Sequence, residues 1–214
     1  MDVYINQGPT GFTPTLLSQN EGTATGTTIT TFSAGDPNVG DTHTFSLVSG
    51  TGGTDNASFT LSSAGVLKNA VVFDRETKSS YSIRVRVTDQ GGLTFEDTRI
   101  VTVTDVNETP YGLTLSNDEI NENQPTGTTI GTFTGLDIDV GETFTYALTG
   151  IGNDNTSFTL TSAGVLKSKS VFNYEVKNSY TIEVTVTDSG NNTYTDTFTI
   201  SVLEIGRASC RERV

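Results

Sequence analysis

Apolar and polar residues alternate with a period of two along much of the chain. Apolar residues occupy every second position in four stretches: Tyr81, Ile83, Val85 and Val87; Tyr180, Ile182, Val184 and Val186; Phe198, Ile200 and Val202; and Val101 with Val103. Because successive side chains of a β-strand point to opposite faces, this alternation places one face in a core and the other in water. Gly, Asn and Asp clusters interrupt the pattern at turn positions, and no helical period is visible. The pattern predicts an all-β chain.

The pattern occurs twice. The segment "GTDNASFTLSSAGVLKN" (53–69) returns as "GNDNTSFTLTSAGVLKS" (152–168), and "SSYSIRVRVTDQGG" (79–92) returns as "NSYTIEVTVTDSGN" (178–191). The spacing of about 100 residues is that of a whole domain and not of a solenoid unit. The chain therefore contains two repeats.

Each repeat contains about seven short strands over roughly 95 residues, which predicts an antiparallel two-sheet sandwich. The segment "YINQGP" near the start lies opposite "DVNETP" between the repeats, so we expect the chain to begin within a preceding repeat. We predict the end of that repeat and its linker at 1–14, a first repeat at 15–108 and a second repeat at 109–204.

The last ten residues, 205–214, do not follow the repeat pattern. They read "IGRASCRERV" and contain three arginines and the only cysteine. One back-translation of this segment resembles a sequencing-adapter oligonucleotide read in frame, so we interpret it as an artefact and exclude it from the fold. The remaining chain has no cysteine, and therefore offers no disulfide framework and no thiol nucleophile.

Charge and hydropathy exclude several classes of protein. The formal net charge of −13 at pH 7 opposes binding to nucleic acid, whose phosphates need Lys and Arg, and favours a surface that attracts cations. No apolar run reaches the roughly 18 residues of a membrane span, and no signal peptide opens the chain. Any export signal or anchor is expected outside this chain.

Acidic residues gather at the ends of the predicted strands. They are Glu21, Asp74, Glu76, Asp105 and Glu108 in the first repeat and its linker, and Asp137, Asp139 and Asp188 in the second repeat. We expect the first group at the end of repeat 1 next to the linker, and the second group at the facing end of repeat 2. Like charges at 4 Å repel by about 4 kcal/mol per pair at an effective dielectric constant near 20, so such a cluster calls for cations. Oxygen ligands select a hard cation, and Ca²⁺ with its flexible coordination fits better than Mg²⁺.

These motifs resemble those of tandem cadherin repeats, particularly the cadherin-like repeats of large bacterial surface proteins. Cadherin repeats carry an early Pro-Glu-Asn, a Leu-Asp-Arg-Glu, a linker Asp-x-Asn-Asp-Asn-x-Pro, and an Asp-x-Asp and an Asp-x-Gly in the next repeat. The resemblance covers residues 15–204. It implies two tandem seven-stranded Greek-key β-sandwiches of the immunoglobulin-like type, with Ca²⁺ bound at each junction.

Carried over by position, the resemblance implies nine metal ligands at the central junction. They are Glu21, Asp74, Glu76, Asp105, Asn107, Glu108, Asp137, Asp139 and Asp188. The chain departs from the family at Asn20 and Gly22, which flank Glu21, and at Glu108 and Thr109, where the family has Asp and Asn. The change in the linker alters the expected geometry of one ion.

The outer junctions match less well. Asp36, Asn38 and Asp89 form the upper half of an outer site, but Tyr4 stands where its linker should have Asp. At the far end Asn173 replaces the Asp of the Asp-Arg-Glu motif. Only the central junction is expected to be complete.

The resemblance implies a non-enzymatic module of cell adhesion, or of the stalk of a cell-surface protein, extracellular and membrane-anchored through regions outside the chain. Its expected partners are calcium ions, neighbouring repeats of the same chain, and another cell-surface protein or a glycan; homophilic adhesion is the behaviour of the animal members. The alternative is a carbohydrate-binding or spacer module of a secreted polysaccharide-active enzyme. The absence of Trp, and so of a stacking platform, counts against it.

Three other features carry less weight. His43 lies in a predicted strand with no second His or Cys for zinc, and is expected to be an ordinary strand residue. Asp74 and Glu76 lack the cleft and hydrophobic wall that a glycosidase pair needs. Four Asn-x-Ser/Thr triplets matter only in a eukaryotic secretory path.

Overall fold

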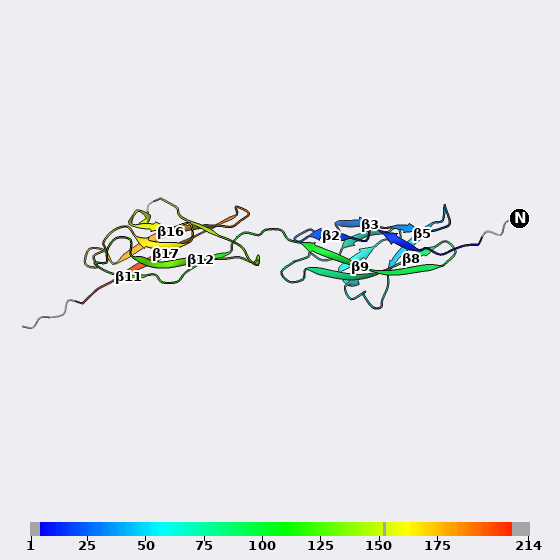
Figure 1. Cartoon of the computed structure of the whole chain (residues 1–214), viewed down its shortest axis with the longest axis horizontal. Helices are drawn as coiled ribbons and strands as arrows, with labels where there is room; N and C mark the ends of the chain where they lie inside the picture. The colour runs from blue at the N-terminus through cyan, green and yellow to red at the C-terminus, as the bar shows by residue number, and fades with distance from the viewer. Residues whose placement is uncertain (1–4, 152, 207–214) are drawn as a thin grey trace, which may run out of the picture. The chain divides into compact units, whose positions relative to one another are not determined.

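The computed structural model describes residues 5–151 and 153–206. Across these residues the chain consists of β-strands with two short 3-10 turns, η1 (Asn56–Ser58) and η2 (Asn155–Ser157), and no α-helix. The strands form two compact units, Met1–Val106 and Asn107–Val214, each of which we describe by itself (Figure 1). The predicted all-β class with two sandwiches is confirmed. From residue 207 onward, the adapter-like segment lies outside the described residues.

The first unit contains strands in three sheets. Their bounds are β1 (Gly11–Thr13), β2 (Leu17–Asn20), β3 (Thr28–Thr31), β4 (Ser33–Gly35), β5 (His43–Leu47), β6 (Phe59–Leu61), β7 (Val66–Asn69), β8 (Ser80–Asp89) and β9 (Thr94–Thr104). One layer is the four-stranded sheet β2-β9-β8-β5, and the other is formed by β3-β7-β6 together with the β1-β4 pair. The strand β2 runs parallel to β9, whereas the other pairs are antiparallel.

The second unit repeats this plan with two four-stranded sheets. Its strands are β10 (Gly112–Leu115), β11 (Glu119–Asn121), β12 (Thr129–Leu136), β13 (Thr145–Leu148), β14 (Phe158–Leu160), β15 (Val165–Ser168), β16 (Ser179–Thr187) and β17 (Thr193–Leu203). The sheets have the orders β10-β12-β15-β14 and β11-β17-β16-β13. Among the described residues, each unit has seven strands when a split strand is counted once. The first strand of each repeat is split between the two layers, as β1 and β2 in repeat 1 and as β10 and β11 in repeat 2. In repeat 1, β3 and β4 are also two parts of one strand.

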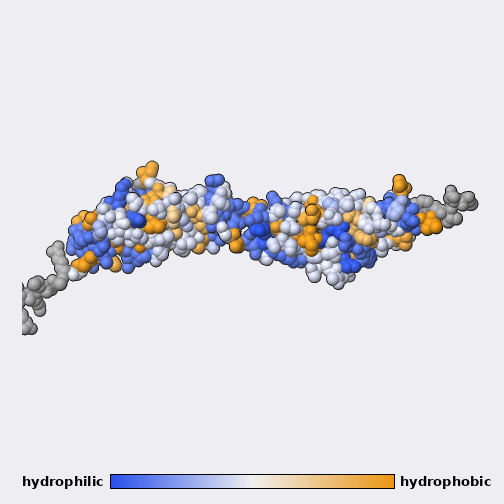
Figure 2. All heavy atoms as spheres, viewed as in Figure 1, coloured by the Kyte–Doolittle hydropathy of each residue, from blue (hydrophilic) through white to orange (hydrophobic). Residues whose placement is uncertain are grey.

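The period-two pattern marks the core residues. Ile83, Val85 and Val87 on β8 are fully buried, as are Ile182, Val184 and Val186 on β16. Aromatic rings also pack in each core. In the first unit, for example, the ring centroids of Phe59 and Phe73 lie 5.5 Å apart. On the face shown in Figure 2, the hydrophobic residues form small, separate groups among hydrophilic ones.

One strand of the first unit precedes residue 15, at which we predict that repeat 1 begins. β1 pairs with β4, and Phe12 at the centre of β1 is buried in the core of the first unit. The predicted boundaries of the repeats stay a prediction.

Candidate metal centre

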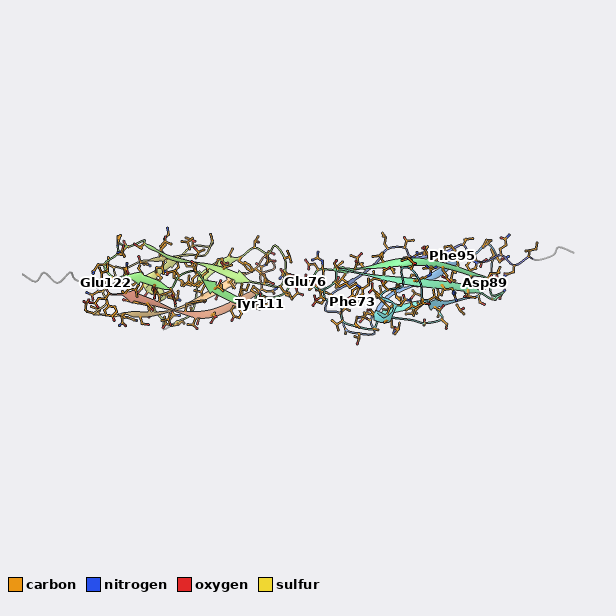
Figure 3. All side chains as sticks on the ribbon, turned by 90° about the horizontal axis from the view of Figure 1, so that it is seen from below. Phe73, Glu76, Asp89, Phe95, Tyr111 and Glu122 are labelled. Atoms are coloured by element: carbon orange, nitrogen blue, oxygen red, sulfur yellow. The ribbon has the colours of Figure 1, made fainter. Side chains whose placement is uncertain are left out.

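Three of the predicted ligands meet at one end of the first unit. Glu21, Glu76 and Asp105 each offer a carboxylate oxygen, and these oxygens lie within 4.8 Å of one another. Glu21 follows β2 and Asp105 follows β9, and because these strands are parallel neighbours, their ends reach the same edge of the sheet. Figure 3 shows Glu76 at this end of the unit and Asp89 at the opposite end. We call Glu21, Glu76 and Asp105 the lower triad.

Glu21 is held by the backbone on both sides. Its side chain is nearly buried, at 7% exposure; Oε2 accepts a hydrogen bond from the N–H of Arg75 at 2.8 Å, and Oε1 accepts one from the N–H of Val106 at 2.9 Å. The next residue, Gly22, adopts a left-handed conformation with φ of 64°, which glycine does at no steric cost. Glu21 therefore ties the loop before β8 to the start of the linker.

Burial and the crowding of the lower triad raise the pKa of Glu76. Burial raises the pKa of its carboxyl above the ordinary value, and the neighbouring charges of Glu21 and Asp105 raise it further. A raised carboxyl pKa indicates that the negative charge is poorly compensated. A bound cation would remove that cost.

Asp74 does not join the lower triad in this structure. Its Oδ1 accepts a hydrogen bond from the N–H of Thr77 and its Oδ2 one from the Thr77 hydroxyl, both at 2.9 Å. These bonds lower the pKa of Asp74. The carboxylate stabilises the turn before β8, and its predicted role as a ligand stays a prediction.

The other five predicted ligands lie in the second unit, at the end where its linker enters. Asp188 follows β16 and is 5% exposed; its Oδ1 accepts from the N–H of Asn192 at 2.7 Å and its Oδ2 accepts from Nδ2 of Asn107 at 2.9 Å. Asp139 Oδ2 accepts from the N–H of Glu108 at 2.9 Å. The linker residues are therefore fastened to the loops of repeat 2 by side-chain hydrogen bonds.

Two carboxylate oxygens at this end have no hydrogen-bond partner among the described residues. They are Oδ2 of Asp137 and Oδ1 of Asp139, both buried. Buried polar atoms are almost always paired in native proteins, so each exception needs a cause. A pocket of about 240 Å³ lies here, lined in part by Asp137, Asp139 and Glu142. Two carboxylates that line one pocket, each with an oxygen that no described residue binds, fit a cation.

The two sets of ligands belong to different units, and the covalent chain is what joins them. Asp105 is the last ligand of the first set, and Asn107 is the first ligand of the second set. One residue, Val106, separates them.

The upper end of repeat 1 has a feature that sequence reasoning missed. Asp36, Asp41 and Asp89 bring carboxylate oxygens within 4.8 Å of one another, whereas Asp36, Asn38 and Asp89 were expected there. Asp41 could have been found from the sequence, because the aligned residue of repeat 2, Glu142, is also acidic. His43 lies in β5 as predicted, but its Nε2 is also 2.9 Å from Oδ2 of Asp36. Tyr4, on which the predicted weakness of this junction depends, lies outside the described residues.

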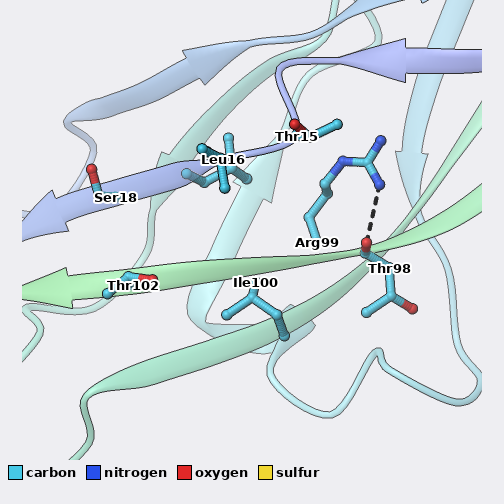
Figure 4. Close-up of a pocket in the computed structure, with 8 residues that line it drawn as sticks. Thr15, Leu16, Ser18, Thr98, Arg99, Ile100 and Thr102 are labelled. Atoms are coloured by element: carbon cyan, nitrogen blue, oxygen red, sulfur yellow. Dashed lines mark hydrogen bonds between the residues drawn. The ribbon is translucent and has the colours of Figure 1, made fainter.

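A pocket in the first unit lies elsewhere, beside β2 and β9 (Figure 4). It has a volume of about 530 Å³. The guanidinium of Arg99 in its wall is bonded internally, to the carbonyls of Phe12 and Thr98 and to Asp97. Arg99 is 6% exposed and stacks 4.1 Å from the Phe12 ring, so it serves the fold.

No helix long and apolar enough to cross a membrane occurs in residues 5–151 and 153–206. The prediction that any anchor lies outside this chain stays a prediction.

Comparison with known proteins identifies the family. A family model for the cadherin domain matches residues 16–104 and 117–203. Human protocadherin Fat 4 is 32% identical over 194 residues, covering 86% of this chain and 4% of that protein; rat cadherin-8 is 30% identical over 158 residues, covering 64% and 20%. The chain thus spans a small part of the curated relatives it matches.

Solved structures show the same fold. The structure of human protocadherin-24 EC1-2 superposes with a TM-score of 0.75 at 20% identity, covering 94% of this chain and 100% of that one. The named relatives are animal proteins, so the resemblance to bacterial surface proteins in particular is not supported by them. Cadherins are adhesion proteins and not enzymes, and none of these relatives supports the carbohydrate-binding alternative. The chain belongs to the cadherin family and contains two cadherin domains.

Proposed function

We propose that the chain is a calcium-binding module in which Ca²⁺ stiffens the link between the two repeats, for cell adhesion or within the stalk of a cell-surface protein. The observation that carries the proposal is a pair of buried oxygens, Oδ2 of Asp137 and Oδ1 of Asp139, to which no described residue donates a hydrogen bond. The lower triad of repeat 1, with oxygens within 4.8 Å, supports it from the other side of Val106.

Nine residues would hold the ions: Glu21, Asp74, Glu76, Asp105, Asn107, Glu108, Asp137, Asp139 and Asp188. All offer oxygen, which suits a hard cation, and the mixture of carboxylate, amide and backbone carbonyl groups suits the irregular coordination of Ca²⁺. When bound, the ion supplies positive charge that neutralises the acids and links groups from both repeats.

The chain's own residues prepare the linker for this role. Glu21 holds the N–H of Val106 from repeat 1, while Asp188 and Asp139 hold Asn107 and Glu108 from repeat 2. Each end of the linker is thus held by side chains of the repeat that it adjoins. An ion bound by both sets would stiffen the link between the repeats.

A calcium-binding role implies an extracellular compartment. Extracellular calcium modules bind with dissociation constants of roughly 10⁻⁴–10⁻³ M, which suits the outside of a cell and not the cytosol. We propose an extracellular or cell-surface location with an anchor elsewhere in the parent protein. Its partners would be neighbouring repeats and another cell-surface protein, with homophilic contact as the family precedent. A parent of the large bacterial surface type is part of this proposal.

Small-angle X-ray scattering of the chain tests the proposal. Profiles would be recorded in chelator and in millimolar calcium at fixed ionic strength, with magnesium as the control cation. We expect calcium to narrow the distribution of interdomain distances, and magnesium to leave it close to the chelator profile. Identical profiles in all three conditions would reject calcium-dependent stiffening.

A further inference from the structure

Arg75 lies among the acids of the lower triad. Its Nη1 is 2.8 Å from Oδ1 of Asp105 and 3.8 Å from Oε1 of Glu76. The guanidinium therefore shares the carboxylates that a cation at this end of repeat 1 would use.

The backbone and the side chain of Arg75 have separate roles. Its N–H donates to Oε2 of Glu21 at 2.8 Å. In repeat 2 the aligned residue is Tyr174, whose N–H donates to Oε2 of Glu122 at 3.2 Å. Because Tyr174 provides the same backbone bond, the fold of this loop does not require an arginine, and the positive charge of Arg75 needs another reason.

We propose that the Arg75 guanidinium is a built-in counter-ion of the lower triad, which Ca²⁺ must displace from Asp105, and that Arg75 thereby sets the calcium affinity of the junction. This inference rests on the proposed function. Without metal the guanidinium offsets part of the repulsion between Glu21, Glu76 and Asp105. With metal the Asp105 oxygen that Arg75 holds becomes a ligand.

The ion pair is weak enough to be displaced. The side chains of Arg75 and Asp105 are 42% and 52% exposed, and exposed ion pairs are screened by water and salt. Ca²⁺ carries twice the charge and takes several oxygens at once. The cost of displacing Arg75 should therefore lower the calcium affinity by about two- to five-fold, the range expected from exposed ion pairs.

The matched variants come from repeat 2. Arg75→Tyr installs the residue found at the aligned position and keeps the backbone bond to Glu21. Arg75→Lys keeps the charge, loses the planar fork, and serves as a second variant if the first folds poorly. Arg86→Thr is the control: it also takes the aligned residue, Thr185, and removes the same charge from the outer face of β8, where Arg86 pairs with Glu96.

Calcium titration calorimetry of the full chain and thermal unfolding in chelator test the inference together. Arg75→Tyr should raise the calcium affinity about two- to five-fold and lower the unfolding temperature of repeat 1 in chelator, but not in saturating calcium. Arg75→Lys should fall between it and the wild type, and Arg86→Thr should not change the affinity.

An Arg75→Tyr chain that folds and binds calcium with unchanged or weaker affinity would overturn the counter-ion role while leaving the proposed function intact. Absence of calcium uptake by the wild type would instead overturn the proposed function.

Discussion

The lower ends of the two repeats share a framework and differ in charge. Glu122 repeats the bonds of Glu21: its Oε2 accepts from the N–H of Tyr174 and its Oε1 from the N–H of Ile205, both at 3.2 Å. Around it, however, Asn173 replaces Asp74 and Tyr174 replaces Arg75. Because the bonds of Glu122 are kept where Asp74 and Arg75 have been replaced, this glutamate has a structural role in both repeats.

The upper ends differ in the same way. Asp188 and Asp89 each accept a hydrogen bond from the side-chain amide of an asparagine in the segment before the repeat. The donor is Asn107 for Asp188 and Asn6 for Asp89, each at 2.9 Å. Beside them, repeat 2 has Asp139 where repeat 1 has Asn38, and Phe144 where repeat 1 has His43. The end of repeat 2 that meets the central linker thus keeps the larger set of carboxylates.

The largest effect is expected from Glu76, one of the ligands that we propose for the central junction. Glu76→Gln removes one carboxylate charge from the lower triad. It should weaken calcium binding by more than about 100-fold, since even the loss of a group that only orients a ligand costs about 10- to 100-fold. Calorimetry measures the affinity. The matched control is Glu175→Gln at the aligned position of repeat 2, which should leave it unchanged; equal losses in both variants would remove the distinction between the two ends.

A comparable loss, in stability instead of binding, is expected from the shared glutamates. Glu21→Gln and Glu122→Gln each replace an oxygen acceptor by an amide donor that faces a backbone N–H. Each should destabilise its own repeat by about 1–3 kcal/mol, the usual cost of an unsatisfied buried group. Hydrogen exchange in chelator, read on β8 and β16 separately, assigns the loss to a repeat; an effect in only one repeat would show that the framework is not shared.

A gain in stability is expected at a core position where the repeats differ. Gln19 is 9% exposed, and neither of its side-chain polar atoms has a hydrogen-bond partner among the described residues. It pairs with Val103 as Ile120 pairs with Val202. Gln19→Ile should stabilise repeat 1 by about 1–3 kcal/mol, because it removes two buried unpaired groups.

Denaturant unfolding of repeat 1 measures that gain. The reverse exchange, Ile120→Gln, should destabilise repeat 2 and serves as the control. A loss of stability in Gln19→Ile would mean that the amide has partners that the structure does not record.

The smallest effect is expected in acid and should be equal in the two repeats. For Asp55, burial raises the pKa, but the bonds from Lys78 and from the N–H of Ser82 outweigh it, so the net pKa is lowered. For Asp154, the bond from Lys177 is the largest cause and the net pKa is again lowered. A lowered carboxyl pKa contributes stability above the unfolded value near pH 4, and this contribution is lost as the pH falls through the folded value.

Asp55→Asn and Asp154→Asn should therefore flatten the decline of stability below about pH 4, each in its own repeat. Thermal unfolding between pH 2 and pH 7 provides the measurement, with the unsubstituted repeat in each variant as the internal control. A decline that is unchanged in both variants would assign the acid sensitivity to other carboxylates.

Sequence was sufficient for the strands and for the ends at which the acids gather. Alternation of apolar residues determines which face of β8 or β16 is buried, and the parallel pairing of β2 with β9 brings Glu21 to Asp105. These features follow from local periodicity and from the order of the strands.

The hydrogen bonds of side chains in the loops could not be predicted from periodicity and strand order. Three contacts depend on how the loops pack against one another. They are the hydrogen bonds of Asp74 with Thr77, of Glu21 with two backbone N–H groups and of His43 with Asp36. Residue types at fixed spacing do not determine those contacts. The burial of Gln19 and Arg99 was not predicted, because a polar residue in a strand is normally expected on the solvent face. Alignment with Ile120 and Phe198 of repeat 2 shows that both occupy positions of apolar core residues.

The decisive measurement of calcium binding is titration calorimetry of the wild-type chain ending at residue 204, at physiological ionic strength. We expect saturable calcium uptake with dissociation constants of roughly 10⁻⁴–10⁻³ M, and little response to magnesium. Absence of uptake up to several millimolar calcium, in a chain that is folded, would contradict this expectation.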